Sequence, residues 1–157
     1  EKECKIYQIM NLQEKINFDI KEAMKARNTD KLAALRALKS AIMLEATKKG
    51  VITVPDEVSL QLAAKLVKQR KEAASIFIEQ NRKDLAQDEM SQLAFLEVYL
   101  PKQIGEDKIR EVVKEVIIHV GASSSVDTGK CMGQLKQKLK GKADGTVVSR
   151  ILREELS

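Results

Sequence analysis

The stretch LAALRALKSAIMLEATKKG, residues 32–50, decides the fold class of this chain. Its apolar residues recur three and four positions apart, as they do on one face of an α-helix. Most of its residues are Ala, Leu, Lys or Glu, which are strong helix formers. Gly50 comes directly after this pattern and is typical of the position that follows a helix C-terminus. The stretch therefore predicts an amphipathic helix that ends at Gly50.

Helical periodicity continues on both sides of this stretch. One helix is expected from Leu12, with Asn28 as a capping residue in the turn that follows it. Residues 51–54 are apolar but have no partner strand in view, so we interpret them as a loop. The apolar spacing then predicts two further helices, over residues 56–80 and 85–100. Four helices joined by short loops favour antiparallel packing in one bundle.

Pro101 marks a boundary in the chain. A proline disfavours helical geometry in the residue before it, and the segment 101–105 is predicted to be a linker. Three shorter helices are expected beyond it. The first is rich in β-branched residues, so a strand competes, but its i, i+3, i+4, i+7 spacing favours a helix. Three residues indicate where these helices begin or end: Gly121 follows the first helix, Asp127 precedes the second and Asp144 precedes the third.

These elements define an all-α fold. It consists of an N-terminal helical bundle of about four helices, residues 10–100, and a small three-helix C-terminal module, residues 106–157. Residues 1–9 are interpreted as a leader or a disordered extension. The aromatic content of only 3%, with no Trp, agrees with this class, because sheet proteins use more aromatic and β-branched residues.

The overall charge permits an anionic partner without requiring one. The chain has 28 Lys and Arg against 23 Asp and Glu, a net charge of +5, which suits RNA. No apolar run approaches the roughly 18 residues of a membrane span, and no secretory signal is visible at the start. A cytoplasmic location without a membrane partner is therefore expected.

Residues that could perform chemistry are scarce and scattered. His119 is the sole histidine, and Cys4 and Cys131 are the only cysteines, so a zinc site of four such ligands is excluded. His119 is predicted in the last turn of a helix, where it complements the helix dipole. Cys131 stands beside apolar residues and is interpreted as an inert thiol, and two free thiols are expected rather than a disulfide. No nucleotide or metal-binding motif is present, so no catalytic residue, cofactor or metal is predicted.

Positive charge gathers near the C-terminus. The stretch from Gly129 to Arg153 holds seven cations and one acid, a local net charge of +6. It spans a glycine-containing turn and the predicted start of the last helix, where free backbone N–H groups suit a phosphate. A solvated surface without a partner is the alternative. The candidate RNA-binding residues are Lys130, Lys136, Lys138, Lys140, Gly141, Lys142, Gly145 and Arg150.

Several short motifs in the C-terminal half resemble the GatB/YqeY family. They are Tyr99-Leu100-Pro101, Gly121-Ala122-Ser123, Gly129-Lys130-Cys131-Met132-Gly133 and Lys140-Gly141-Lys142-Ala143-Asp144-Gly145. The likeness runs from near Met10 to Leu156. Cys131, where the family more often has an aliphatic residue, and Gly105, where a capping Ser is common, depart from the pattern.

The resemblance implies a small helical protein similar to the tail of the B subunit of glutamyl- and aspartyl-tRNA amidotransferases. That tail is thought to hold tRNA, and Lys130, Lys136, Lys140, Lys142 and Gly145 match its candidate contact region. The expected function is therefore a non-catalytic accessory protein that binds tRNA or another structured RNA. One alternative is an adaptor that docks on an aminoacyl-tRNA or amidotransferase enzyme. Another is a partner-dependent carbon–nitrogen ligase with glutamine as amide donor, an activity that in the family belongs to a catalytic domain not seen here.

Overall fold

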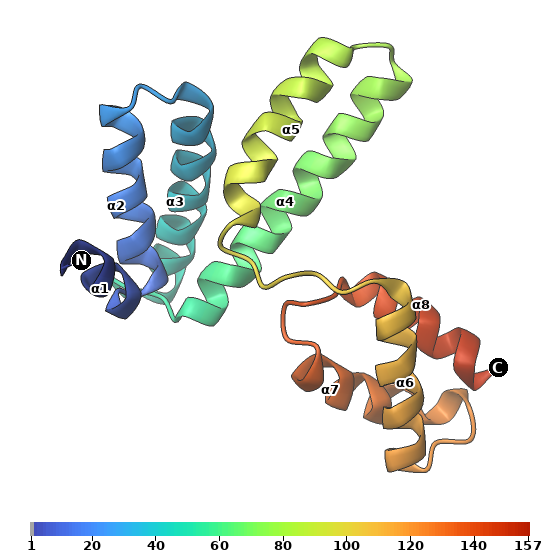
Figure 1. Ribbon diagram of the computed structural model, residues 1–157. Coiled ribbons are helices and arrows are strands. Elements are labelled where there is room, and N and C mark those ends of the chain that lie inside the picture. The colour runs from blue at the N-terminus through green and yellow to red at the C-terminus, as the bar shows by residue number, and fades with distance from the viewer. Residues whose placement is uncertain (1) are drawn as a thin grey trace. The chain divides into compact units, whose positions relative to one another are not determined.

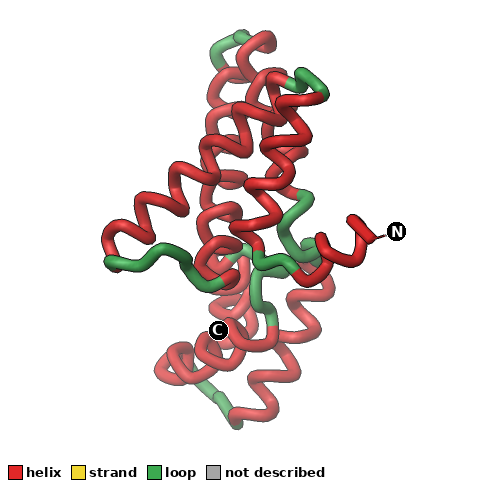
Figure 2. Tube along the Cα trace, turned by 90° about the vertical axis from the view of Figure 1, so that its left-hand side faces the viewer, coloured by secondary structure: helices red, strands yellow, loops and turns green. Residues whose placement is uncertain are grey.

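The computed structural model describes residues 2–157, with side chains from residue 5 onward. The described chain forms helices and no strand (Figures 1 and 2), which confirms the all-α class. It divides into two compact units, one ending at Leu100 and the other beginning at Pro101. None of the described helices combines the length and the apolar character that crossing a membrane requires.

The N-terminal unit contains the four expected helices and a further one before them. The structure has a helix over residues 2–9, where the sequence was interpreted as a leader or a disordered extension. The helices are α1 (Lys2–Ile9), α2 (Leu12–Lys25), α3 (Thr29–Lys49), α4 (Asp56–Glu79) and α5 (Lys83–Glu97). In Figure 1, α2 and α3 form one antiparallel hairpin and α4 and α5 form another.

Local capping explains where these helices begin and end. The Asn11 side chain accepts a hydrogen bond from the Glu14 N–H, and the Asn11 N–H donates one to the Glu14 carboxylate, so α2 starts with a capping box. At the start of α3 the Asn28 side chain accepts from the Lys31 N–H. Gly50 ends α3 with φ of 66°, a left-handed conformation that glycine adopts without strain. The sequence signals at Asn28 and Gly50 are thereby confirmed.

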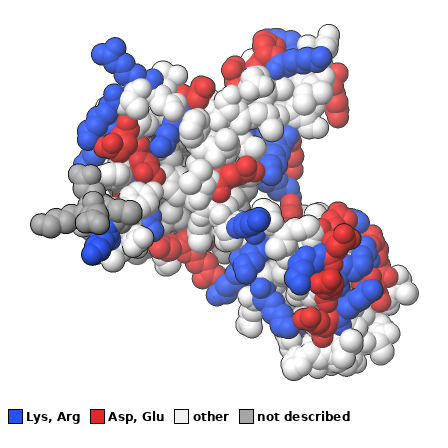
Figure 3. Space-filling view, viewed as in Figure 1, with Lys and Arg blue, Asp and Glu red and all other residues white. Residues whose placement is uncertain are grey.

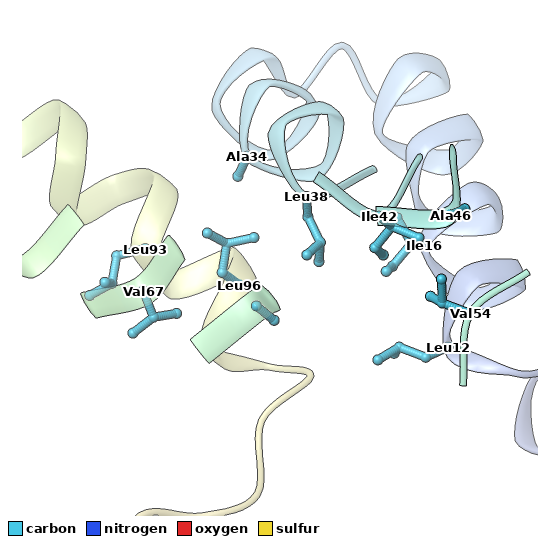
Figure 4. Close-up of a cluster of buried hydrophobic side chains, with 11 residues drawn as sticks. Leu12, Ile16, Ala34, Leu38, Ile42, Ala46, Val54, Val67, Leu93 and Leu96 are labelled. Carbon is cyan, nitrogen blue, oxygen red and sulfur yellow. The ribbon is translucent and has the colours of Figure 1, made fainter. Parts of the chain in front are cut away.

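One apolar cluster holds the two hairpins of this unit together. Its side chains come from α2, α3, α4, α5 and the loop residue Val54 (Figure 4). Leu38 and Ile42 of α3 and Leu96 of α5 are almost completely buried. Burial of one such side chain contributes about 1.5 to 3 kcal/mol. The loop before α4 is thus anchored by Val54, whereas Val51 and Ile52 of the same apolar stretch are exposed.

Tyrosine hydroxyls tie both ends of the N-terminal unit to Asp19 of α2. The Tyr7 hydroxyl of α1 donates to the Asp19 carboxylate over 2.8 Å, and the Tyr99 hydroxyl donates to the same oxygen. The Tyr7 ring also meets the Phe18 ring edge-to-face at 5.7 Å. Burial, followed by the bond to Asp19, raises the pKa of Tyr7 to about 12. The pKa of Tyr99 is raised well above its usual range by the same causes.

The C-terminal unit is the expected three-helix module with a short 3₁₀ turn. The β-branched segment that could have been a strand forms a helix, and Gly121 ends it with φ of 70°, as predicted. Its core contains Val113, Val116, Leu135, Ile151 and Leu152, all fully buried. The elements are α6 (Glu106–Val120), η1 (Ser125–Asp127), α7 (Thr128–Lys138) and α8 (Gly145–Leu156).

Two aspartates precede helices in this unit, and only one of them caps its own helix. The Asp144 carboxylate accepts from the Thr146 N–H over 2.8 Å at the start of α8, as predicted. Asp127 stands before α7 but gives it no side-chain cap. Its carboxylate accepts from the Ser123 N–H instead, over 3.2 Å. Asp127 therefore closes the loop that precedes α7.

Candidate nucleic-acid interface

The candidate lysines lie on helix α7 and on residues 139–144, which join α7 to α8 and are called the connection. Core packing decides their direction, because Cys131, Leu135 and Leu139 follow each other at four-residue intervals and are buried. The candidate lysines stand between these anchors or before and after them, and all are exposed. In Figure 3, blue side chains gather over the α7–α8 connection, whereas blue and red alternate over α6 and α8.

Four of these lysines have no acidic partner among the side chains that the structure describes. Lys130, Lys136, Lys140 and Lys142 are exposed. They make no ion pair within residues 5–157, whose side chains the structure describes. Asp144 is the single acid between Lys130 and Arg150 in the chain, and its carboxylate is bonded to the backbone of α8. An uncompensated positive surface of this kind attracts phosphate groups.

Two other predicted cations are engaged with acids from elsewhere in the unit. The Arg150 guanidinium lies 2.5 Å from a Glu106 carboxylate oxygen and 3.1 Å from one of Glu154. Lys138 lies 4.0 Å from Glu115. These acids lie outside the basic stretch, so counting charge along the sequence missed them. Arg150 therefore acts as a link between α6 and α8.

Arg110 extends this link. Its guanidinium bonds to Glu154 over 2.8 Å and to Glu155 over 2.5 Å. The hydrogen bond from Arg110, and then the contact with Arg150, hold the pKa of Glu154 below its usual range. The C-terminal end of α8 and the start of α6 thus neutralise each other, and positive charge remains on α7 and the connection.

The two candidate glycines differ in their surroundings. Gly141 has φ of +66°, and a Cβ added there would lie 3.3 Å from the Pro101 Cγ. Gly145 begins α8 and has open space around it. The predicted phosphate site at the start of α8 already holds the Asp144 carboxylate, which binds the Thr146 N–H. A phosphate would meet a like charge there, so the lysines are the stronger candidates.

The segment predicted to be a linker lies against the basic connection. The Gln103 side chain donates to the Gly141 carbonyl over 2.6 Å, and the Ile104 N–H donates to the Lys142 carbonyl over 3.0 Å. Lys102, which is exposed, therefore belongs to a segment that is bonded to the connection carrying Lys140 and Lys142. Sequence reasoning missed Lys102 because it lies far from the basic stretch in the chain, with no local pattern that signals the pairing.

The positions of His119 and Cys131 agree with the sequence analysis. His119 is exposed in the last turn of α6. Cys131 is a buried free thiol, and burial raises its pKa, which makes it a poor nucleophile. The side chain of Cys4 lies outside the described residues. Among the side chains that are described, no group of His, Cys, Asp and Glu is arranged to hold a metal ion.

Fold and surface together define a small all-helical protein of two compact units, with a basic surface on the C-terminal one. The chain belongs to the Yqey-like protein family, whose model matches residues 13–156. This confirms the resemblance seen in the sequence. The chain is also similar to "Altered inheritance of mitochondria protein 41, mitochondrial" of Pyrenophora tritici-repentis (strain Pt-1C-BFP). The two are 29% identical over 145 residues, which cover 89% of this chain and 78% of that protein.

Proposed function

We propose that this chain is a non-catalytic accessory protein that binds tRNA or another structured RNA through its C-terminal unit. The observation that carries the proposal is a set of four exposed lysines that make no ion pair with any side chain of residues 5–157: Lys130, Lys136, Lys140 and Lys142. The resemblance to the tail of the tRNA-dependent amidotransferase B subunit supports the choice of RNA. No chemistry is assigned to the chain itself.

The contacts are proposed to be with phosphates and not with bases. All five Phe and Tyr residues precede Pro101 and the chain has no Trp, so His119 supplies the one aromatic ring of the C-terminal unit and a row of rings for stacking successive bases is absent from its sequence. Lysine binds phosphate as a point charge and reads no sequence. A folded RNA, which holds its phosphates at fixed spacing, fits such a surface better than a flexible single strand.

The test is the binding of purified protein to bulk tRNA, followed by fluorescence anisotropy between about 50 and 200 mM salt. One variant carries Lys130, Lys136, Lys140 and Lys142 as Ala. The matched control carries Lys39, Lys48, Lys83 and Lys114 as Ala, four exposed lysines elsewhere that likewise make no ion pair among the described side chains. Both variants lose the same net charge, so a difference between them reports position.

The proposal expects salt-dependent binding that the first variant loses and the control keeps. Each phosphate contact contributes about 0.7 to 0.9 to the slope of log affinity against log salt. Affinity falls as salt rises, so the loss of four contacts makes this negative slope less steep by about 3. Equal loss in both variants, or absence of binding at the lowest salt, would overturn the proposal and place the adaptor function first.

We also propose a cytoplasmic location for this chain. The similar fungal protein is mitochondrial according to its name, and that statement concerns the fungal protein alone. Cell fractionation with an antibody against the chain tests the location. Recovery from an organelle in place of the cytosol would contradict it.

A further inference from the structure

Residues 101–104 are bonded to the basic connection by two hydrogen bonds and one apolar contact. The hydrogen bonds join Gln103 to the Gly141 carbonyl and the Ile104 N–H to the Lys142 carbonyl. The Pro101 ring lies directly beside Gly141. Ile104 also packs, partly buried, against the core of the C-terminal unit. The segment is therefore a fixed part of this unit and not a free linker.

These hydrogen bonds also occupy carbonyl oxygens of the connection that would otherwise face an anion. Backbone carbonyl oxygens carry partial negative charge and would repel a phosphate. The carbonyls of Leu139, Gly141 and Lys142 each accept a hydrogen bond, from the Lys142 N–H, the Gln103 amide and the Ile104 N–H respectively. These three carbonyls of the connection thus bind donors of the unit itself, while the side chains of Lys140 and Lys142 stay exposed.

We propose that the segment 101–104 is part of the RNA-binding surface, with Lys102 as a further phosphate contact. Lys102 lies in the chain between Pro101 and Gln103, whose side chains both approach Gly141, so its Cα is about 3.8 Å from the Cα of each of these two residues. Its side chain is exposed and makes no ion pair among the described residues. Lys102, Lys140 and Lys142 then form one cationic group from two distant parts of the chain. This inference rests on the proposed function.

The contact of Lys102 with a phosphate depends on the folded structure of the C-terminal unit. In the folded unit the phosphate backbone of an RNA meets the two lysines of the connection and Lys102 together. In a peptide of residues 129–157 alone, Lys102 would be absent and the Gly141 and Lys142 carbonyls would lack their partners.

The test compares three single substitutions in the full chain: Lys102→Ala, Lys140→Ala and Lys114→Ala. Lys114 is the control because it is exposed on α6, eight residues beyond the first helical residue Glu106, which is about 12 Å along the helix. The salt dependence of tRNA binding is measured for each variant by fluorescence anisotropy. Lys102→Arg, which keeps the charge, serves as the rescue.

The inference expects that Lys102→Ala and Lys140→Ala each make the negative slope of log affinity against log salt less steep by about 0.7 to 0.9. Lys114→Ala and Lys102→Arg keep the wild-type slope. A wild-type slope for Lys102→Ala together with a lowered slope for Lys140→Ala overturns the inference and leaves the proposed function intact. Absence of salt-dependent binding in the wild-type chain overturns both.

Discussion

Substitution of Gly141 by alanine is expected to lower the free energy of unfolding of the C-terminal unit by about 1 to 2 kcal/mol. The cause lies first in the backbone, because Gly141 has φ of +66°, where a side chain is strained. The second cause is contact, since the added Cβ would lie 3.3 Å from the Pro101 Cγ and 3.6 Å from its Cδ. The proline ring must shift by a few tenths of an ångström, and with it the segment that carries Lys102.

The matched control is Gly133→Ala. Gly133 lies inside α7, and nothing lies within 4 Å of a Cβ added there. Alanine in a helix interior is more favourable than glycine by about 0.5 to 1 kcal/mol. The same chemical change is therefore expected to stabilise the unit at one position and to destabilise it at the other.

Urea unfolding followed by circular dichroism measures both effects. In thermal unfolding, each kcal/mol corresponds to about 4 to 8 °C in Tm for a unit of this size. If Gly141→Ala leaves the free energy of unfolding unchanged or raises it, as Gly133→Ala is expected to do, the structural interpretation of Gly141 is wrong.

Three further predictions concern both units. Replacing Arg150 by Gln is expected to leave the salt slope of RNA binding unchanged, because Arg150 is paired with acids of α6 and α8; a slope lowered by about 0.7 to 0.9 in the anisotropy assay would show a phosphate contact. Leu135→Ala, at a fully buried position, is expected to lower the free energy of unfolding by about 2 to 5 kcal/mol, and a loss below about 1 kcal/mol in urea unfolding would contradict the core assignment. In an ultraviolet pH titration, Tyr7 and Tyr99 are expected to ionise at a higher pH than free tyrosine does. Asp19→Asn is expected to lower the pKa of both. Because the pKa of Tyr7 is raised from 10.0 to about 12, the stability from its neutral hydroxyl is complete below pH 10 and is lost as the pH rises toward 12; unchanged titration in Asp19→Asn would exclude Asp19 as the partner.

Much of the fold could be predicted because its signals are local. The capping side chain of Asn28 and the left-handed Gly50 act within one turn of helix, and both act as the sequence indicated. The β-branched segment of α6 was correctly assigned from spacing alone. Residues 2–9 were not predicted as a helix, because the contacts of Tyr7 with Phe18 and Asp19 lie on another element.

The candidate site was predicted less completely. The sequence located the basic stretch but could not show which of its cations are neutralised. The partner of Arg150 in α6, Glu106, lies 44 residues away in the chain, and the Gln103 amide reaches Gly141 across 38 residues. Such pairings depend on how helices pack and leave no periodic pattern in the sequence.

By itself, then, the sequence determined that this chain is helical, where most helices begin and end, and where its positive charge is concentrated. These properties depend on spacings of three and four residues and on the chemistry of single capping residues. The tertiary structure decided that Arg150 is engaged with Glu106 and Glu154. It also decided that residues 101–104 belong to the C-terminal unit. The physical reason is that ion pairs and backbone contacts between distant segments form only when the core of Leu135, Ile151 and their neighbours brings those segments together.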